Sequence, residues 1–480
     1  MRLLFLVHRF LPKHVGGAEI TAYETAHALA REHEVCVAYP AEVSMPSYES
    51  WDIEGDSYQE LPIRRLISAP PDPKDPAARH NIYNPAGVNA LRACLDEIQP
   101  ELVHIHSLGR LSAAAIWELK ARGIPVVLTL HDLWFLCTRY HLVNIDGELC
   151  RGPKGGRQCL LSECYQYLPD RFDPFEKPLS AAALESAPMP GAATQQRSLG
   201  WRALRGISGP IRGLIPPAIK ERAKQQYSPA PDPKRAPVPA PLWLPFLRTQ
   251  LMRETLAEVD LLISPSRFLR DRFVEHGISP DRIRLLPNGI AANRFGEASK
   301  RPHTGLIFGY LGSLDAKKGV HDLVRAFNLM RPEEARCYIA GPLGGPYADK
   351  LQELSTNPSL TFVGSLPPDQ VPEFYRDIDV FVLPSLCYEN SPVTIHEAYW
   401  TGTPVIAVNA GGMAELVSHE RSGLLYQRGD AEDLCRQLRR FIADPDLVPR
   451  MREHLPREAS VTEVAATLLT WYSELVARSN

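Results

Sequence analysis

Two glutamates, Glu389 and Glu397, stand eight positions apart around the dipeptide Ser391-Pro392, directly after the apolar run 380–384. Serine is a favoured N-cap and proline suits the first turn, so the pattern predicts a helix that begins here. The open N–H groups of such a helix attract an anion, and the flanking carboxylates can accept hydrogen bonds from hydroxyls. A ligand with hydroxyls on both sides of a phosphate, such as a sugar nucleotide, fits this arrangement. Taken alone, the two carboxylates could also be surface charges that complement the helix dipole.

A second candidate site contains Lys317 and Lys318, which follow a buried run and its glycines in GYLGSLDAKKG. Two ammonium groups at the start of a helix oppose its dipole unless an anion is bound. The pattern therefore favours phosphate binding. We expect Lys318 to be the ligand, because Gly319 beside it would leave room for the phosphate.

The first part of the chain holds two more candidates. Gly16 and Gly17 precede a predicted helix, where bare backbone lets an anion approach the amides, although a tight turn explains such a pair by itself. His131 and Asp132 directly follow the apolar run IPVVLTL. His131 would thus reach a ligand at the end of a strand as a hydrogen-bonding or proton-handling group. Alternatively one of them caps the next helix, a role that suits Asp132 better.

These residues follow short apolar runs that alternate with helical segments, a pattern typical of parallel sheets covered by helices on both faces. A chain of 480 residues exceeds the usual size of one core. We therefore predict an α/β protein with two doubly wound, Rossmann-like domains that face each other across a cleft. The expected domains are residues 1–290 and 291–455, with a terminal helix at 456–480 that packs back towards the first domain.

The alternation lapses between about residues 151 and 248, where a proline-rich stretch excludes regular structure. Within this insertion, residues 197–224 carry Lys and Arg between apolar side chains, with Glu221 as the acidic residue. Such a segment could lie on an anionic membrane surface or cover an acceptor groove. The other interpretation is an insertion with a solvated basic face.

Composition narrows the class of protein. The 53 Lys and Arg nearly balance the 56 Asp and Glu, which excludes the basic footprint of a nucleic-acid-binding protein. No window approaches the ~18 apolar residues of a membrane-spanning helix, and the first ten residues predict a buried strand rather than a signal peptide. An odd number of cysteines, nine, favours a reducing compartment. We expect a cytoplasmic protein, peripheral at the inner membrane face if the basic segment contacts lipid.

Four of the cysteines fall within 28 residues: Cys137, Cys150, Cys159 and Cys164. Four thiolates could hold a structural zinc ion in a segment that has little else to bury. The spacing lacks the close Cys-x2-Cys pairs of common zinc sites, so reduced thiols are an equal alternative. Two disulfides would require an oxidising compartment.

The ordered motifs together resemble one family. They are Gly16-Gly17-Ala18-Glu19, His131, LLPNGI, GSLDAKKG, LTFVGSLP, DVFVLPS, ENSPVTIHEA and AGGMAELV. This set is similar to the retaining glycosyltransferases of family four, which have the GT-B fold. The resemblance covers most of residues 1–150 and 255–455, and the Glu-x7-Glu arrangement is its most specific part. The central insertion is not covered.

The resemblance implies that the first domain binds the acceptor and the second binds a nucleotide-diphosphate sugar. It implies three catalytic residues. His131 would lie near the reacting centre, Lys318 would pair with the diphosphate, and Glu389 would contact the transferred sugar. It further implies a donor site in which Glu397 binds the ribose and the other members are Gly16, Gly17, Ser313, Lys318, Gly364, Asn390, Ser391, Pro392 and Val393. Many members carry Arg where Ser313 stands, so this chain has one cation fewer near the leaving group.

The resemblance also implies the reaction. A sugar would move with retention of configuration to a glycan or lipid-linked acceptor, in surface polysaccharide or glycolipid biosynthesis. Asp377 and Asp379 have the form of a metal-binding Asp-x-Asp motif, but their place between a helix and a buried strand indicates turn chemistry. We therefore expect no catalytic metal or cofactor. The alternatives are an epimerase or phosphorylase on the same fold, and a non-catalytic protein that binds sugar nucleotides.

Overall fold

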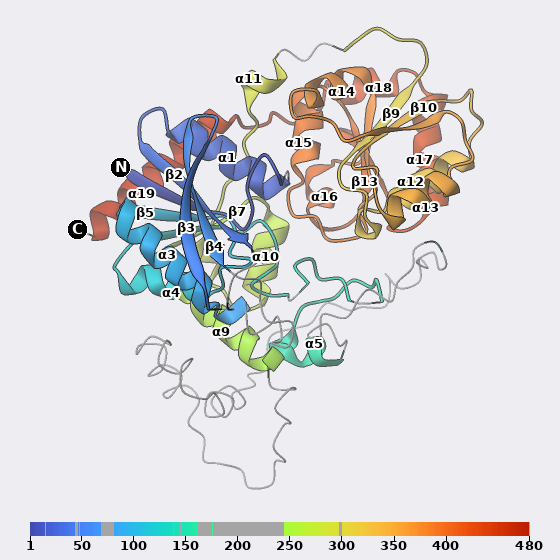
Figure 1. Cartoon of the computed structure of the whole chain (residues 1–480). Coiled ribbons are helices and arrows are strands. Elements are labelled where there is room, and N and C mark those ends of the chain that lie inside the picture. Colours follow the sequence, from blue (N-terminus) through green and yellow to red (C-terminus); the bar gives the residue numbers. More distant parts are fainter. Residues whose placement is uncertain are drawn as a thin grey trace, which may run out of the picture.

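The structure is a computed structural model that describes residues 1–14, 16–43, 47, 49–68, 81–137, 139–144, 146–161, 175, 244–296 and 300–479. The chain forms two lobes, each a sheet with helices on both faces (Figure 1). The predicted class, α/β with two Rossmann-like domains, is confirmed. The basic segment 197–224 and Cys164 lie outside the described residues.

The first sheet has eight strands in the order β3-β4-β2-β1-β5-β6-β7-β8. Its strands are β1 (Arg2–Leu6), β2 (Glu34–Glu42), β3 (Trp51–Tyr58), β4 (Leu61–Ser68), β5 (Leu102–Ile105), β6 (Val126–Thr129), β7 (Leu261–Ser264) and β8 (Ile283–Leu285). All neighbouring strands are parallel except β3 and β4. The direction of strand succession reverses between β1 and β5, so the loops after these two strands flank a crevice.

The helical segments of this part are α1 (Gly17–Leu29), α3 (Pro85–Ile98), α4 (Ala114–Ala121), η1 (Lys154–Gly156), α5 (Arg157–Leu161), α9 (Leu244–Glu258), α10 (Arg267–Glu275) and η5 (Pro280–Arg282). Side-chain caps define two of their starts. Asn84 accepts a hydrogen bond from the Gly87 amide at 3.2 Å, and Ser266 accepts one from the Leu269 amide at 3.2 Å. Helix α9 begins at Leu244, slightly before residue 248, where the sequence suggested that the irregular stretch ends.

The second sheet has six parallel strands in the order β11-β10-β9-β12-β13-β14. They are β9 (Ile307–Leu311), β10 (Arg336–Ala340), β11 (Leu360–Gly364), β12 (Val380–Leu383), β13 (Val405–Val408) and β14 (Gly423–Tyr426). The helical segments are α11 (Ala292–Phe295), η6 (Ala316–Lys318), α12 (Val320–Asn328), α13 (Pro346–Leu354), α14 (Val371–Asp377), α15 (Val393–Trp400), α16 (Gly411–Leu416), α17 (Ala431–Ala443) and α18 (Leu447–Arg452). Strand succession reverses here between β9 and β12, so the loops after these strands flank the second crevice.

The chain passes between the lobes twice, and the two crossings run side by side. The Ile290 amide donates to the Ala459 carbonyl at 2.9 Å, and the Val461 amide donates to the Ile290 carbonyl at 3.0 Å. After the second crossing, α19 (Val461–Ser479) packs beside α1 on the first lobe, and its Leu468 and Tyr472 are buried there (Figure 1). The last helix therefore joins the core of the first domain.

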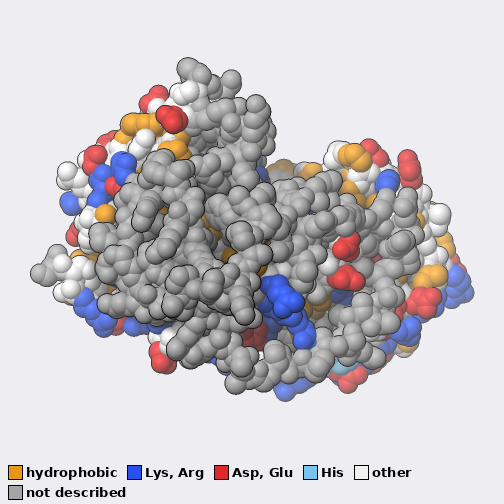
Figure 2. Space-filling view, turned by 90° about the horizontal axis from the view of Figure 1, so that it is seen from below, with side chains coloured by type: hydrophobic (Ala, Val, Ile, Leu, Met, Phe, Trp, Pro, Cys, Tyr) orange, Lys and Arg blue, Asp and Glu red, His pale blue; other side chains and the backbone are white. Residues whose placement is uncertain are grey.

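The described surface carries mixed charge. In Figure 2, the visible Lys and Arg side chains lie along the margins of this face and, in one group, nearer its middle, with Asp and Glu nearby in both places. Among the described residues, none of the helices has the length and apolar character needed to cross a membrane.

Candidate functional site

Lys318 and Glu389 form an ion pair in the second crevice. Lys318 ends η6 in the loop after β9, and Glu389 lies in the loop after β12, so adjacent strands bring the two loops together. Nζ of Lys318 lies 2.6 Å from Oε1 of Glu389. The same oxygen accepts a hydrogen bond from the Ser385 hydroxyl at 2.6 Å and one from the Cys387 thiol at 3.6 Å. The two catalytic candidates of this domain are therefore neighbours.

This pair is charged at neutral pH. Burial raises the pKa of Glu389, but the attraction of Lys318 and the hydrogen bonds to Oε1 outweigh it, so the pKa lies below its usual value. Burial lowers the pKa of Lys318, and the attraction of Glu389 more than reverses this shift. A fixed ammonium group at the crevice can thus stabilise an anionic leaving group.

The loop before Lys318 is held by its own polar groups. The Ser313 hydroxyl donates to Oδ2 of Asp315 at 2.8 Å, and Oδ1 of Asp315 accepts from the Lys317 amide at 3.0 Å. Gly319 has a φ of +67°, and a Cβ there would lie 1.9 Å from the Pro384 carbonyl oxygen. The expectation that Gly319 leaves room for a ligand is therefore wrong, because the chain itself fills that space.

Glu397 lies on α15 and is only 3% exposed. Its Oε1 accepts from Nη2 of Arg294 at 2.6 Å, and its Oε2 accepts from the Tyr375 hydroxyl at 3.1 Å. Nη1 of Arg294 also lies 3.4 Å from Oε1 of Glu24 on α1, so this guanidinium connects both lobes. Burial raises the pKa of Glu397, although Arg294 and Tyr375 oppose the shift. Sequence reasoning missed Arg294, since no motif marks it in the turn after LLPNGI.

The start of α15 differs from the prediction. The first helical residue is Val393, Pro392 occupies the N-cap position, and the Ser391 side chain makes no cap. The Ser391 hydroxyl instead pairs with Nε2 of His396 at 2.7 Å, and Nδ1 of His396 pairs with Oε2 of Glu458 at 2.5 Å. The prediction of Ser391 as N-cap is wrong because a buried imidazole competes for its hydroxyl. The helix still begins beside Glu389, as the pattern required.

Glycines shape the loop that carries Glu389 and Asn390. The Gly412 amide donates to the Glu389 carbonyl at 2.6 Å, and a Cβ at Gly412 would lie 1.7 Å from the Asn390 carbonyl oxygen. The segment Ala410-Gly411-Gly412 therefore packs against the backbone of this loop. Gly364 ends β11 with a φ of +78°, a conformation that glycine adopts without strain.

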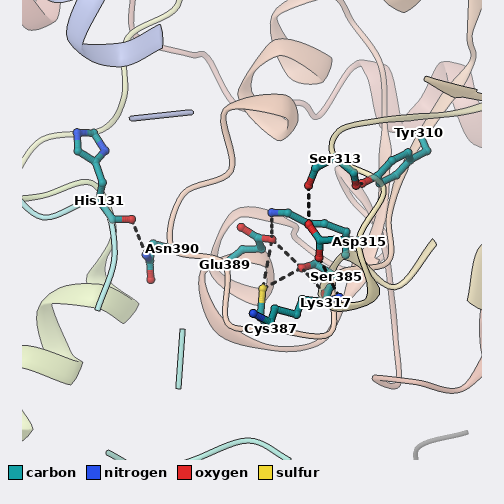
Figure 3. Close-up of polar contacts among 10 residues, drawn as sticks. His131, Tyr310, Ser313, Asp315, Lys317, Ser385, Cys387, Glu389 and Asn390 are labelled. Atoms are coloured by element: carbon teal, nitrogen blue, oxygen red, sulfur yellow. Dashed lines mark hydrogen bonds and ion pairs between the residues drawn. The ribbon is translucent and has the colours of Figure 1, made fainter. Parts of the chain in front are cut away.

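The first lobe approaches the same loop. Nδ2 of Asn390 donates to the His131 carbonyl at 2.7 Å (Figure 3). A Cβ at Gly17 would lie 3.4 Å from Cγ2 of Val393, so the start of α1 faces the start of α15. Gly16 lies at the N-cap of α1, and a Cβ there would meet the Glu19 carboxylate at 2.5 Å. The candidates from both lobes thus border one cleft.

His131 is a neutral imidazole in this setting. Burial, and then the charge of His8, lower its pKa to about 4. Its Nε2 lies 2.8 Å from Nδ1 of His106, so one ring donates a hydrogen bond to the other. An uncharged His131 can accept or donate a hydrogen bond to a sugar without adding positive charge at the reacting carbon.

A pocket beside Lys317 lies between the lobes. It is lined by Val143, Asn144, Gly147, Ala316, Lys317, Leu386, Cys387 and Arg428. The Arg428 guanidinium donates to the Leu386 carbonyl at 2.6 Å and to the Gly147 carbonyl at 2.7 Å. Arg428 thereby joins the segment that follows β6 in the first lobe to the loop after β12 in the second lobe.

The structure places the metal candidates as follows. Asp377 pairs with Arg301 at 3.0 Å, and Asp379 accepts a hydrogen bond from the Ile307 amide at 2.9 Å. Both carboxylates are therefore engaged in contacts with this chain. Within the described ranges, no three His, Cys, Asp or Glu side chains are grouped to hold a metal ion. Since Cys164 is outside those ranges, the four-cysteine zinc site stays a prediction.

Two family models match this chain. Residues 293–458 match the family model described as Glycosyl transferases group 1, and residues 15–187 and 229–294 match Glycosyltransferase Family 4. Among curated relatives, D-inositol 3-phosphate glycosyltransferase of Nocardia farcinica is 29% identical over 219 residues, which cover 42% of this chain and 48% of the relative. The chain thus spans about half the length of the curated relatives it matches.

Solved structures extend the likeness to the whole fold. Sucrose-phosphate synthase from Thermosynechococcus elongatus has a TM-score of 0.63 at 18% identity, and the match covers 99% of each chain. The HepE protein of Anabaena in complex with UDP and glucose has a TM-score of 0.58 at 15% identity, over 98% of this chain and 99% of that one. At these identities the likeness concerns the fold.

Proposed function

Because the chain belongs to the family-four glycosyltransferases with the GT-B fold, we propose that it transfers a sugar from a nucleotide-diphosphate sugar to a glycan or lipid-linked acceptor, with retention of configuration. We place this reaction in surface polysaccharide or glycolipid biosynthesis. The observation that carries the proposal is the 2.6 Å pair of Lys318 and Glu389 beside the first turn of α15.

The roles follow from position. Lys318 would pair with the diphosphate, and Glu389, fixed by that ammonium, would accept hydrogen bonds from the transferred sugar. The backbone from Asn390 to Val393 would lie along the sugar and the diphosphate, with Gly16 and Gly17 approaching from the other lobe. Glu397 would bind the ribose hydroxyls through lone pairs that Arg294 and Tyr375 leave available, and Gly364 would border the base.

The chemistry is a displacement at the anomeric carbon. The bond from this carbon to the diphosphate oxygen breaks, and a bond to the acceptor oxygen forms on the same face. The acceptor proton passes to the departing phosphate oxygen, so no protein base is required. Negative charge develops on the leaving group, where Lys318 and the amides of α15 can stabilise it by several kcal/mol. We propose that this proceeds without a catalytic metal or cofactor.

A nucleotide screen tests the proposal. Calorimetric titration of the full chain with UDP, GDP, ADP and their sugar derivatives should identify one that binds, and NMR of the product made from that donor should show the retained anomer. Release of an isomerised nucleotide sugar would identify an epimerase, and sugar phosphate formed from inorganic phosphate would identify a phosphorylase. Binding without turnover would identify a non-catalytic protein.

A matched variant checks the donor site itself. Glu397→Gln removes the charge that we assign to the ribose, so it should weaken every nucleotide alike, whatever its base. Thermal unfolding of the unliganded variant provides the control for folding. Absence of any nucleotide-dependent shift in both proteins would contradict the assignment.

We also propose a structural zinc ion at Cys137, Cys150, Cys159 and Cys164. The amide of Arg139 donates to Sγ of Cys137 at 3.3 Å, and the amide of Gly152 donates to Sγ of Cys150 at 3.4 Å. Such bonds stabilise a thiolate, the form that binds zinc. The ion would order the segment whose Gly147 meets Arg428.

The proposed location is the cytoplasm, at the inner membrane face if residues 197–224 bind anionic lipid. Co-sedimentation of the full chain with phosphatidylglycerol vesicles, compared with phosphatidylcholine vesicles, tests this contact. Equal sedimentation with both would contradict it.

A further inference from the structure

The crevice of the first lobe is bordered by basic side chains. Arg9, Lys13 and His14 lie in the loop after β1 and are exposed, and Arg110 lies in the loop after β5. We call these four residues the basic rim. The two loops touch, since a Cβ at Gly109 would lie 3.4 Å from Cβ of His8. Because strand succession reverses between β1 and β5, the rim stands where ligands bind in such sheets.

Arg9 and Lys13 give the rim positive charge. Among the residues that the structure describes, neither Arg9 nor Lys13 has a carboxylate partner. Glu19 is a buried acid close to the rim loop, and its Oε1 lies 3.4 Å from Nε2 of His8. Burial, followed by the charges of Arg9 and Arg110, lowers the pKa of His8 to about 4.

The rim adjoins the place where the sugar would be transferred. His8 is close enough to His131 for its charge to affect the pKa of that ring. Nδ1 of His8 is buried and has no hydrogen-bond partner among the described residues. Gly17, at the end of the rim loop, faces Val393 across the cleft. The rim loop therefore adjoins His131 at one point and the start of α15 at another.

We propose that the acceptor carries a phosphate group, which Arg9 and Lys13 hold while its hydroxyl lies beside His131. This inference rests on the proposed function and names the acceptor class of the same site. Lys318 serves the donor diphosphate from the other lobe, so the cations of the rim remain for a second anion. The phosphate could belong to a soluble sugar phosphate or to a lipid-linked one, since the recognised chemistry is the same.

The test compares two probes with their phosphate-free counterparts, on the full chain. Glucose 1-phosphate is compared with glucose by calorimetry, and polyprenyl phosphate with polyprenol, both in phosphatidylcholine vesicles, by sedimentation. The variant is Arg9→Gln with Lys13→Gln, and the matched control is Arg31→Gln, an exposed arginine beyond the far end of α1. These exposed substitutions should leave folding intact.

We expect the wild type to prefer at least one phosphate probe over its phosphate-free counterpart. The double variant should bind that probe at least about tenfold more weakly than the wild type does. Arg31→Gln should bind like the wild type, and the dissociation constant of UDP should change by less than about twofold, a difference well below 1 kcal/mol. The responding probe identifies the soluble or the lipid-borne source.

Three outcomes would overturn the inference. The first is equal binding of both phosphate probes and their counterparts by the wild type. The second is equal loss in Arg31→Gln, which would indicate unspecific attraction. The third is a loss of UDP affinity in the double variant as large as the loss of the phosphate probe, which would assign the rim to the donor. If the wild type binds no nucleotide at all, the proposed function fails, and the comparison of phosphate probes still reports on the rim.

Discussion

Nη2 of Arg294 lies 2.6 Å from Oε1 of Glu397. Arg294 belongs to α11, just after the first crossing between the lobes, and Glu397 belongs to α15. Since Arg294 also reaches Glu24 on α1, a single cation serves one carboxylate of each lobe. The environment of Glu397 is thereby connected to the contact between the lobes.

Removing this cation should destabilise the protein. Arg294→Gln leaves the buried Glu397 without its ion pair, and we expect a loss of about 3 kcal/mol in the free energy of unfolding at pH 7.5. Burial already raises the pKa of Glu397 in the folded state, and loss of Arg294 raises it further. The folded variant then takes up a proton more readily than the unfolded chain, so its deficit should shrink as the pH falls. Chemical denaturation across a pH series measures this.

The control for that series is Arg301→Gln. Arg301 pairs with Asp377 on an exposed part of the surface, so its removal should cost less than about 1 kcal/mol. A deficit of the same size in both variants, or one in Arg294→Gln that does not depend on pH, would contradict the role of Glu397 in the effect.

Lys318 should matter for the chemical step. Lys318→Met removes the ammonium that we place on the leaving group, so kcat should fall on the order of 100-fold or more with the identified donor. Steady-state transfer assays measure this. The adjacent Lys317→Met is the matched control, because its amide, not its ammonium, bonds to Asp315. A similar loss in both variants would argue against a specific role for Lys318.

The chain of Ser391, His396 and Glu458 should position the donor loop. It connects the second crossing to Ser391, two residues before α15, so breaking it should loosen donor binding. We expect Glu458→Ala to raise the dissociation constant of the nucleotide sugar about tenfold, and Glu458→Gln, which keeps an acceptor oxygen, to restore most of it. Titration calorimetry compares the two. Equal losses in both variants would point to the charge rather than the hydrogen bond.

Acid should destabilise the contact between α19 and the first sheet. His104 pairs with the Tyr472 hydroxyl at 2.5 Å and with the Thr129 hydroxyl at 2.8 Å. Burial, followed by the charge of His131, lowers its pKa to about 3. Because the unfolded histidine binds a proton near pH 6.5, this contribution to stability is present above that pH and is lost as the pH falls towards 3. Between pH 7 and 5 it amounts to about 2 kcal/mol.

Thermal unfolding at both pH values tests this expectation. His104→Gln should lose less stability than the wild type when the pH is lowered from 7 to 5, and a substitution at the exposed His454 should behave like the wild type. An unchanged pH difference in His104→Gln would show that other groups cause the acid sensitivity.

Zinc content tests the cysteine-rich segment. The purified chain should contain about one zinc ion per molecule by elemental analysis, because four thiolates complete a tetrahedral site. Cys164→Ser should lose the ion and unfold at a lower temperature, while Cys435→Ser, in the core of the other lobe, should keep it. Disulfide-linked peptides in mass spectra, or a metal-free wild type, would contradict the proposal.

The order of the elements could be predicted from the sequence because it depends on local chemistry. Apolar runs such as 380–384 and 126–129 are buried on both faces, and glycines and prolines mark their ends. The hairpin of β3 and β4 was not predicted, since β3 is largely polar and exposed. Strand β3 can be polar because it lies at the edge of the sheet, where β4 is the one described strand that pairs with it.

By itself, the sequence determined that Lys318 and Glu389 follow strands and that a helix begins after Glu389. Strand ends in a parallel sheet share one edge, so this much follows from sequence order and periodicity. Only the tertiary structure decided that Arg294 pairs with Glu397, that Ser391 bonds to His396 and that Pro384 fills the space beside Gly319. These contacts join segments that are distant along the chain or compete for the same hydrogen bond, and packing in three dimensions selects the partner.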